Sequence, residues 1–212
     1  MDDAEFDQAL ITEAFAQAAE DGWSAVSVAS AARHANLPLE RARARFPTRD
    51  SILMRFGRIA DQMALTGATT DGPERDRLFD VVMRRFDALQ AHRAGIKAVI
   101  RELPTRPGLA LGLGLATQAS MAWMLEAAGI AATGLRGLLR VQGLTAVWLY
   151  TLRAWDRDDS ADLSGTMAAL DRALSRAEQF ADLLQGGGAP AKPKPFPEDP
   201  AVELPPAGAV TV

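Results

Sequence analysis

Helical periodicity without strand alternation is the feature of this sequence that most constrains its fold. In residues 3–20, the apolar side chains of Ile11, Phe15 and Ala18 fall on one helical face. No stretch alternates apolar and polar residues over the length of a strand. The sequence therefore predicts an all-α fold. The predicted helices cover residues 3–20, 28–35, 38–46, 49–66, 73–91, 94–103, 108–128, 134–157 and 160–184.

The residue content excludes several kinds of chemistry. The chain has no cysteine, which removes disulfides, thiolate nucleophiles and cysteine-ligated zinc. Its two histidines, His34 and His92, lack the spacing of a metal-binding pair. Neither a G-x-S-x-G nucleophile elbow nor a glycine-rich nucleotide loop is present. We therefore expect no catalytic residues, metal or cofactor, and a protein that is not an enzyme.

The longest apolar run, residues 108–132, is a candidate membrane segment. A membrane span needs about 20 predominantly apolar residues. Polar residues interrupt this run at Gln118, Ser120 and Glu126, and its glycines lower its hydrophobicity. We interpret it as a buried helix, with no integral membrane association. The acidic start of the chain does not resemble a signal peptide, so we expect a cytoplasmic protein.

Charge is distributed unevenly along the chain. The formal net charge is −4, but the window from Arg33 to Arg58 holds seven arginines against Glu40 and Asp50, a local charge of +5. A basic stripe of this kind is typical of a surface that contacts nucleic-acid phosphates.

Two short predicted helices joined by a tight turn overlap the N-terminal part of this basic window. Ser27 is placed to cap the first helix, and Pro38 to open the second. Between them, Asn36 tolerates the positive φ that the turn requires. Alanines at 31, 32 and 35 allow close approach of the helices. This arrangement predicts a helix-turn-helix whose second helix enters the DNA major groove.

At these positions the chain resembles the TetR family of transcriptional regulators. The resemblance rests on Gly22-Trp23, on Ser27-Val28 followed by Ala32-x-x-Ala35-Asn36-Leu37, and on the segment from Phe46 to Leu53. It implies a TetR-like architecture, with an N-terminal three-helix reading domain and a helical body that binds ligand and forms dimers. The DNA-binding residues that we expect on this basis are Ser27, Pro38, Arg41, Arg43, Arg45, Thr48 and Arg49.

The chain departs from the TetR pattern at several positions. It has Glu40 where family members carry a small residue, and Arg43 where they carry an aromatic one. Apolar core positions of the family are Ala31 and Ala42 here. A glutamate on a recognition helix repels phosphate unless it accepts from a cytosine amine. Arg43 is expected to replace the aromatic residue as a phosphate donor.

The C-terminal helices carry a second resemblance. The segment from Trp155 to Ser160, followed by Thr166 and residues 170–174, is similar to the coenzyme Q biosynthesis accessory family. That family consists of lipid-binding proteins with a TetR-like fold. The primary hypothesis is a ligand-responsive DNA-binding regulator. The alternative is a protein that binds a lipid or quinone precursor and assists ubiquinone biosynthesis without reading DNA.

We expect three regions along the chain. Residues 1–48 form the DNA-binding domain, residues 49–185 the ligand-binding and dimerisation body, and residues 186–212 a disordered proline-rich tail. Residues 134–184 are predicted to pair two copies in a homodimer. A small hydrophobic ligand is expected beside a cluster of large side chains. These candidate pocket residues are Met121, Trp123, Met124, Trp148 and Tyr150.

Overall fold

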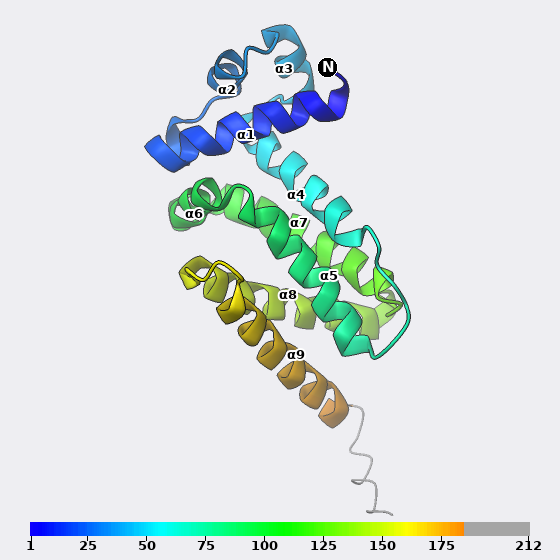
Figure 1. Ribbon diagram of the computed structural model, residues 1–212. Coiled ribbons are helices and arrows are strands. Elements are labelled where there is room, and N and C mark those ends of the chain that lie inside the picture. Colours follow the sequence, from blue (N-terminus) through cyan, green and yellow to red (C-terminus); the bar gives the residue numbers. More distant parts are fainter. Residues whose placement is uncertain (185–212) are drawn as a thin grey trace, which may run out of the picture. The chain divides into compact units, whose positions relative to one another are not determined.

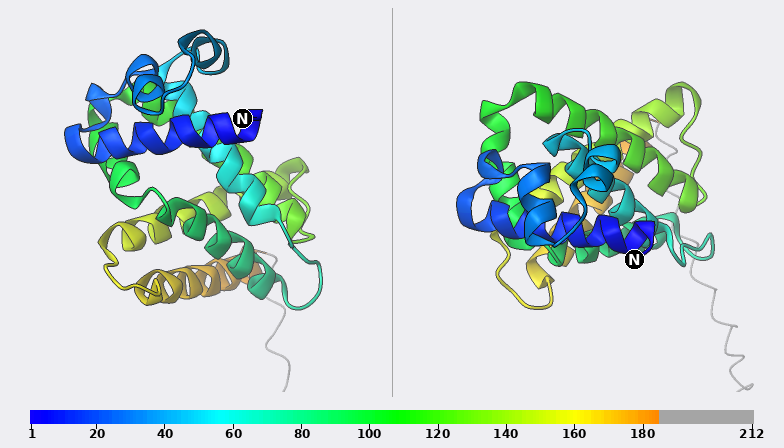
Figure 2. Two further views of the ribbon diagram at one scale, coloured as in Figure 1. Left: turned by 45° about the horizontal axis from the view of Figure 1, so that its top comes forward. Right: turned by 90° about the horizontal axis from the view of Figure 1, so that it is seen from above.

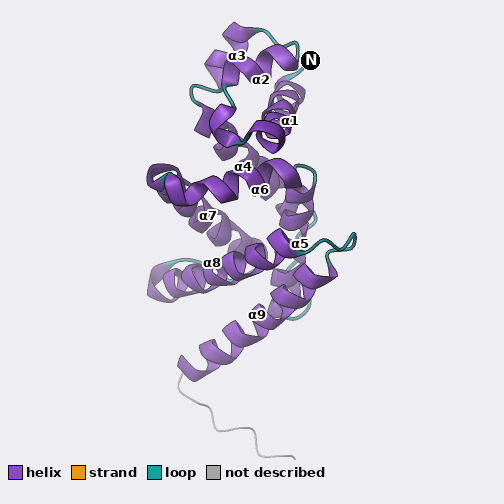
Figure 3. Cartoon of the chain, turned by 90° about the vertical axis from the view of Figure 1, so that its left-hand side faces the viewer, coloured by secondary structure: helices purple, strands orange, loops and turns teal. Residues whose placement is uncertain are grey.

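The computed structural model describes residues 1–184, and this part of the chain is helical without strands (Figures 1 and 3). The predicted tail at residues 186–212 lies outside the described residues. Residues 1–178 form one compact unit. Its expected internal boundary, between residues 48 and 49, falls at the start of α4. The helices are α1 Asp3–Asp21, α2 Val28–His34, α3 Leu39–Arg45, α4 Arg49–Leu65, α5 Glu74–Gln90, α6 Arg93–Glu102, α7 Pro107–Ala127, α8 Gly134–Arg157 and α9 Ser164–Leu184, with short 3₁₀ turns at Trp23–Ala25 and Leu103–Thr105.

The ends of the N-terminal helices follow from local sequence. Ser27 and Thr48 cap α2 and α4 by accepting hydrogen bonds from the backbone N–H groups three residues later, at 3.0 and 3.2 Å. Gly22 ends α1 with a φ of 84°, and Asn36 has a φ of 53° in the turn between α2 and α3. The cap at Ser27 and the turn at Asn36 were predicted, because each depends only on residues nearby in the chain.

The predicted start of the last helix, at residue 160, is wrong by four residues. Leu163 has a φ of 56°, which interrupts a helix, and α9 begins at Ser164. Asp158 reaches across the turn and accepts from the backbone N–H and the hydroxyl of Thr166, at 2.6 and 2.7 Å. Hydrogen bonds from Ser160 and then Thr166 hold the pKa of Asp158 well below its usual range.

The prediction that residues 108–132 form a buried helix is wrong, because α7 is buried on one side only. It packs against α4, α5 and α8, but only one face is covered. Leu111, Leu115 and Trp123 are exposed, and Trp123 has 66% of its surface accessible. Among helices in residues 1–184, α7 alone is long and apolar enough to cross a membrane by length and composition. The prediction failed because the run is apolar on every face, so periodicity does not indicate which face is covered.

Helix α1 joins the N-terminal helices to the rest of the unit, and Figure 2 shows it in two further views. It packs along α6 more extensively than along any other helix. The closest approach is at Gly95 of α6, where an added Cβ would lie 2.4 Å from the carbonyl oxygen of Phe15. A glycine is therefore required at this crossing, and the two helix backbones touch directly.

Candidate functional site

The outer face of α3 is the candidate reading surface. Its inner face is held by Ala42, which is 1% exposed, and by Phe46 at its C-terminal end. The residues that remain on the outer face are exposed. They are Leu39, Glu40, Arg43 and Ala44. The sequence thus folds α2 and α3 as a helix-turn-helix whose second helix presents both charge signs to solvent.

Asp7 of α1 organises the arginines behind this face. Its side chain is 1% exposed. Arg45 donates from Nε and Nη2 to the two carboxylate oxygens, at 2.6 and 2.8 Å, and Arg55 of α4 donates from Nε at 2.6 Å. Burial alone would raise the pKa of Asp7, but the bonds from Arg45 and Arg55 outweigh it and lower that pKa. One buried carboxylate therefore ties α1, α3 and α4 together.

Arg41 and Arg45 are also held by the first turn of α1. Arg41 donates to Asp3 at 2.6 Å and to the carbonyl of Asp2 at 3.0 Å, and its guanidinium lies 4.4 Å from the centre of the Phe6 ring. Arg45 makes a further ion pair with Asp3 at 2.5 Å. Two arginines that the sequence suggested for DNA contact thus have their charges balanced within the protein.

Arg49 is also bound by groups within the protein. Its Nη1 donates to the carbonyls of Trp23 and Ser24 at 3.1 and 2.7 Å, which fixes the connection between α1 and α2. The other candidates for DNA contact are exposed. They are Ser27, Pro38, Arg43 and Thr48. Arg43 keeps one bond to the carbonyl of Pro47 at 2.6 Å, with the rest of its guanidinium unpaired among residues 1–184.

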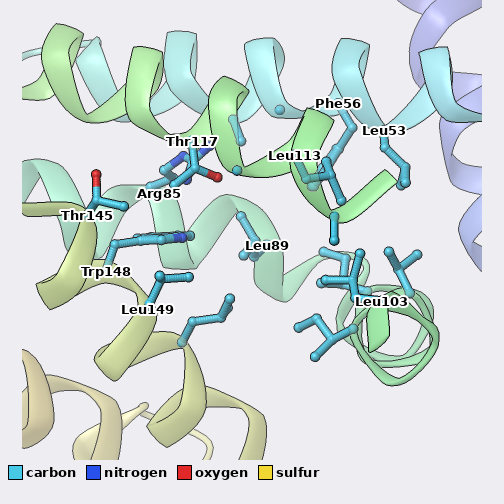
Figure 4. A pocket seen from close by; sticks show the side chains of 18 of the residues that line it. Leu53, Phe56, Arg85, Leu89, Leu103, Leu113, Thr117, Thr145, Trp148 and Leu149 are labelled. Atoms are coloured by element: carbon cyan, nitrogen blue, oxygen red, sulfur yellow. The ribbon is translucent and has the colours of Figure 1, made fainter. Parts of the chain in front are cut away.

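A cavity of about 440 Å³ lies among α4, α5, α6, α7 and α8 (Figure 4). This volume is within the range of small-molecule sites. Its walls are mainly apolar, and its few polar side chains come from α5, α7 and α8. Those polar residues are Arg85, Thr117, Gln118, Gln142 and Thr145.

Only one of the predicted pocket residues, Trp148, lines this cavity. Trp123 borders a smaller neighbouring cavity of about 330 Å³. Met121 and Met124 are fully buried in the packed core, and Tyr150 lies on the exposed side of α8. Those three residues do not line the cavity: it borders α7 at residues 113, 114 and 117, whereas the methionines lie one to two turns further along the same side of the helix, where it is packed in the core.

The polar end of the cavity is built around Arg85, which is 6% exposed. Its Nε donates to Asp61 at 2.8 Å, and its guanidinium stacks on Trp148 at 4.4 Å from the ring centre. Ser120 donates to the other Asp61 oxygen at 2.6 Å. Desolvation lowers the pKa of Arg85, and Asp61 opposes that shift. The pair is a neutral, buried unit that joins α4 to α5.

Sequence reasoning missed both Asp7 and Arg85, although a signal was present. Asp7 belongs to the apolar face of α1 that includes Ile11 and Ala14. Arg85 lies four residues from both Val81 and Leu89 on the buried face of α5. A charged residue inside an apolar helical stripe predicts a buried ion pair, because an unpaired charge is too costly to bury.

Comparison with solved structures identifies the architecture. The chain superposes on a TetR transcriptional regulator from Nitrosomonas europaea with a TM-score of 0.68 and 23% identity, covering 82% of this chain and 99% of that one. A TetR transcriptional regulator from Rhodococcus sp. RHA1 matches with a TM-score of 0.57 and 17% identity, over 83% and 97% of the two chains. Neither a family model nor a curated protein matches by sequence. The chain therefore has the fold of the TetR transcriptional regulators.

Proposed function

We propose that this protein is a ligand-responsive, DNA-binding transcriptional regulator of the TetR type that acts as a homodimer in the cytoplasm. The exposed outer face of α3 carries the proposal. A helix-turn-helix needs its second helix free of contacts on one side so that side chains reach base edges. Leu39, Glu40, Arg43 and Ala44 meet this requirement.

The proposed DNA contacts differ in kind. Arg43 is the charged donor on the outer face of α3, and the capping hydroxyls of Ser27 and Thr48 still have an O–H to donate to phosphate. Arg41 and Arg45 serve mainly to hold α3 against α1, and Arg49 holds the connection between α1 and α2, since their guanidiniums are bound within the protein. Few phosphate contacts predict a shallow dependence of affinity on salt.

The dimer is proposed to use the α8 part of residues 134–184. Large apolar residues are exposed along this helix at helical spacing, as expected of a face that pairs with a second copy. They are Leu135, Leu138, Leu139, Leu149 and Tyr150. Two copies related by a twofold axis would present two reading helices to one DNA duplex.

Selection of DNA from a random-sequence pool tests the proposal. We expect enrichment of a pseudo-palindromic site, and a loss of affinity of about tenfold for Arg43→Ala. Arg101→Ala is the matched control, because Arg101 is an exposed arginine of α6 without an ion pair in the described structure. Failure to enrich any sequence, with the protein folded and dimeric, would overturn DNA reading.

One observation favours a second candidate function, the binding of a lipid or quinone precursor without DNA reading. Asp3 and Asp7 bind Arg41 and Arg45, which reduces the free positive charge of the reading helix, although Asp7 is shared with Arg55. Under this alternative the large cavity remains the functional site. The DNA selection separates the two candidates, since only the first predicts an enriched site.

A further inference from the structure

We propose that the cavity binds a neutral, largely apolar molecule whose one hydrogen-bond acceptor, of carbonyl type, meets Arg85. The inference rests on the part of the proposed function that assigns the cavity to a ligand. It does not depend on DNA binding. Three observations carry it: the free donors of Arg85, the balanced charge around them, and the shape of the cavity at Gly57.

Arg85 offers donors that the protein does not use. Its Nε is bonded to Asp61 and its Nη2 to Ser120, at 2.8 and 3.3 Å. Nη1 has no acceptor among residues 1–184, and protein atoms do not enclose it completely. Arg85 borders both cavities (Figure 4), and we infer that the unpaired Nη1 is the donor that faces them. A buried guanidinium N–H requires an acceptor, which an apolar ligand with one oxygen supplies.

The charge balance selects a neutral acceptor over an anion. Asp61 already pairs with Arg85, so the two side chains together carry no net charge. A carboxylate in the cavity would add an uncompensated negative charge beside Asp61, within walls formed mainly by leucine, isoleucine and phenylalanine. Burying such a charge is costly, whereas a neutral carbonyl oxygen gains a bond to a charged donor without that cost.

Gly57 keeps the cavity open at its boundary with the smaller cavity. It lies in the middle of α4 and borders both cavities. An added Cβ there would meet no atom within 4 Å, so packing does not require glycine at this position. Glycine also weakens a helix interior. The residue leaves room for a ligand that extends along α4 past Arg85.

Three probes of similar size test the chemistry: 2-acetylnaphthalene, 2-ethylnaphthalene and 2-naphthoate. They share one ring system and differ in having a neutral acceptor, no acceptor, or a negative charge. By isothermal titration calorimetry we expect the ketone to bind about tenfold more tightly than either of the others. Equal affinities, tightest binding of the carboxylate, or no binding by any probe would each overturn the proposal.

Two variants locate the binding. The double variant Asp61→Leu/Arg85→Met removes both charges together, so no unpaired charge is left, and the Ser120 hydroxyl is free to donate to the carbonyl of Ala116, 3.1 Å away. We expect it to bind the ketone and the hydrocarbon equally. A preference for the ketone that survives in this variant would contradict the role of Arg85.

Gly57→Leu fills the open space and should abolish binding of all three probes while preserving the melting temperature. Gly108→Leu is the matched control, because Gly108 is another helical glycine with open space around it and does not border the cavity. Unchanged ketone binding by Gly57→Leu would overturn the assignment of the site. Failure of the DNA selection with normal ketone binding would leave this inference standing and remove only the DNA reading.

Discussion

Replacing Asp7 by asparagine tests whether one carboxylate holds α3 in place. The substitution keeps the size of the side chain and removes its charge. The amide oxygen of asparagine can still accept from a guanidinium, but its NH2 group cannot, so Arg45 and Arg55 keep only part of their three bonds at this position and lose the negative charge. Arg45 retains Asp3 as a partner, so the damage is partial.

The size of the loss follows from burial. Removing one partner of a fully buried ion pair costs about 3–5 kcal/mol of unfolding free energy. Asp7 is 1% exposed, but the Arg45 and Arg55 side chains are 23% and 36% exposed, so water compensates part of the loss. We expect a loss of about 2–3 kcal/mol. For a chain of this length the melting temperature falls by roughly 4–12 °C.

The effect should depend on pH. Because the folded-state pKa of Asp7 is lowered, ionised Asp7 contributes stability above its unfolded pKa, and this contribution is lost as pH falls through the folded pKa. The difference between wild type and Asp7→Asn should therefore be full at pH 6–7 and shrink below about pH 4.

Urea unfolding of both proteins at pH 7, 5 and 3 measures this difference. Glu20→Gln is the control on the same helix, because Glu20 is exposed and has no ion pair in the described structure, and it should change stability by no more than about 0.5 kcal/mol. A loss for Asp7→Asn as small as that of the control, or one that is undiminished at pH 3, would refute the reasoning.

Three further substitutions test other parts of the structure. Asp3→Asn frees Arg41, so the affinity for a random-sequence DNA duplex should rise by about threefold at low salt and should depend more steeply on salt. Fluorescence anisotropy measures both, and unchanged affinity would show that Arg41 does not reach DNA. Leu139→Glu should convert the dimer to a monomer in light scattering, whereas the control Leu115→Glu on α7 should leave it dimeric. A dimeric Leu139→Glu protein would place the interface elsewhere. Asp158→Ala should lower stability by about 1–2 kcal/mol in thermal unfolding because it removes the cap of α9, and an unchanged melting temperature would contradict that role.

Local chemistry explains which parts of the fold the sequence predicted. The cap at Ser27 and the turn at Asn36 depend on residues within a few positions, and they are where the sequence indicated. The start of α9 depends on Asp158 reaching eight residues along the chain to Thr166. A contact of that span competes with the nearer capping residues and cannot be recognised from spacing alone.

The site was less predictable than the fold, because partners and cavities are tertiary properties. Arg45 is a basic residue in sequence, but its partner Asp7 lies 38 positions earlier. The apolar character of Met121 and Trp148 indicates that both are buried, and both are. It does not indicate that only Trp148 borders empty space.

The contact at Gly95 has a mechanical consequence. Helix α6 presents Gly95 to the backbone of Phe15, and its residues Ile96, Val99 and Ile100 line the cavity. Where side chains separate two helices, rotamer changes absorb small displacements. No such compressible layer lies at this crossing, since backbone meets backbone. A shift of α6 would therefore be transmitted directly to the backbone of α1, and from α1 through Asp7 to α3.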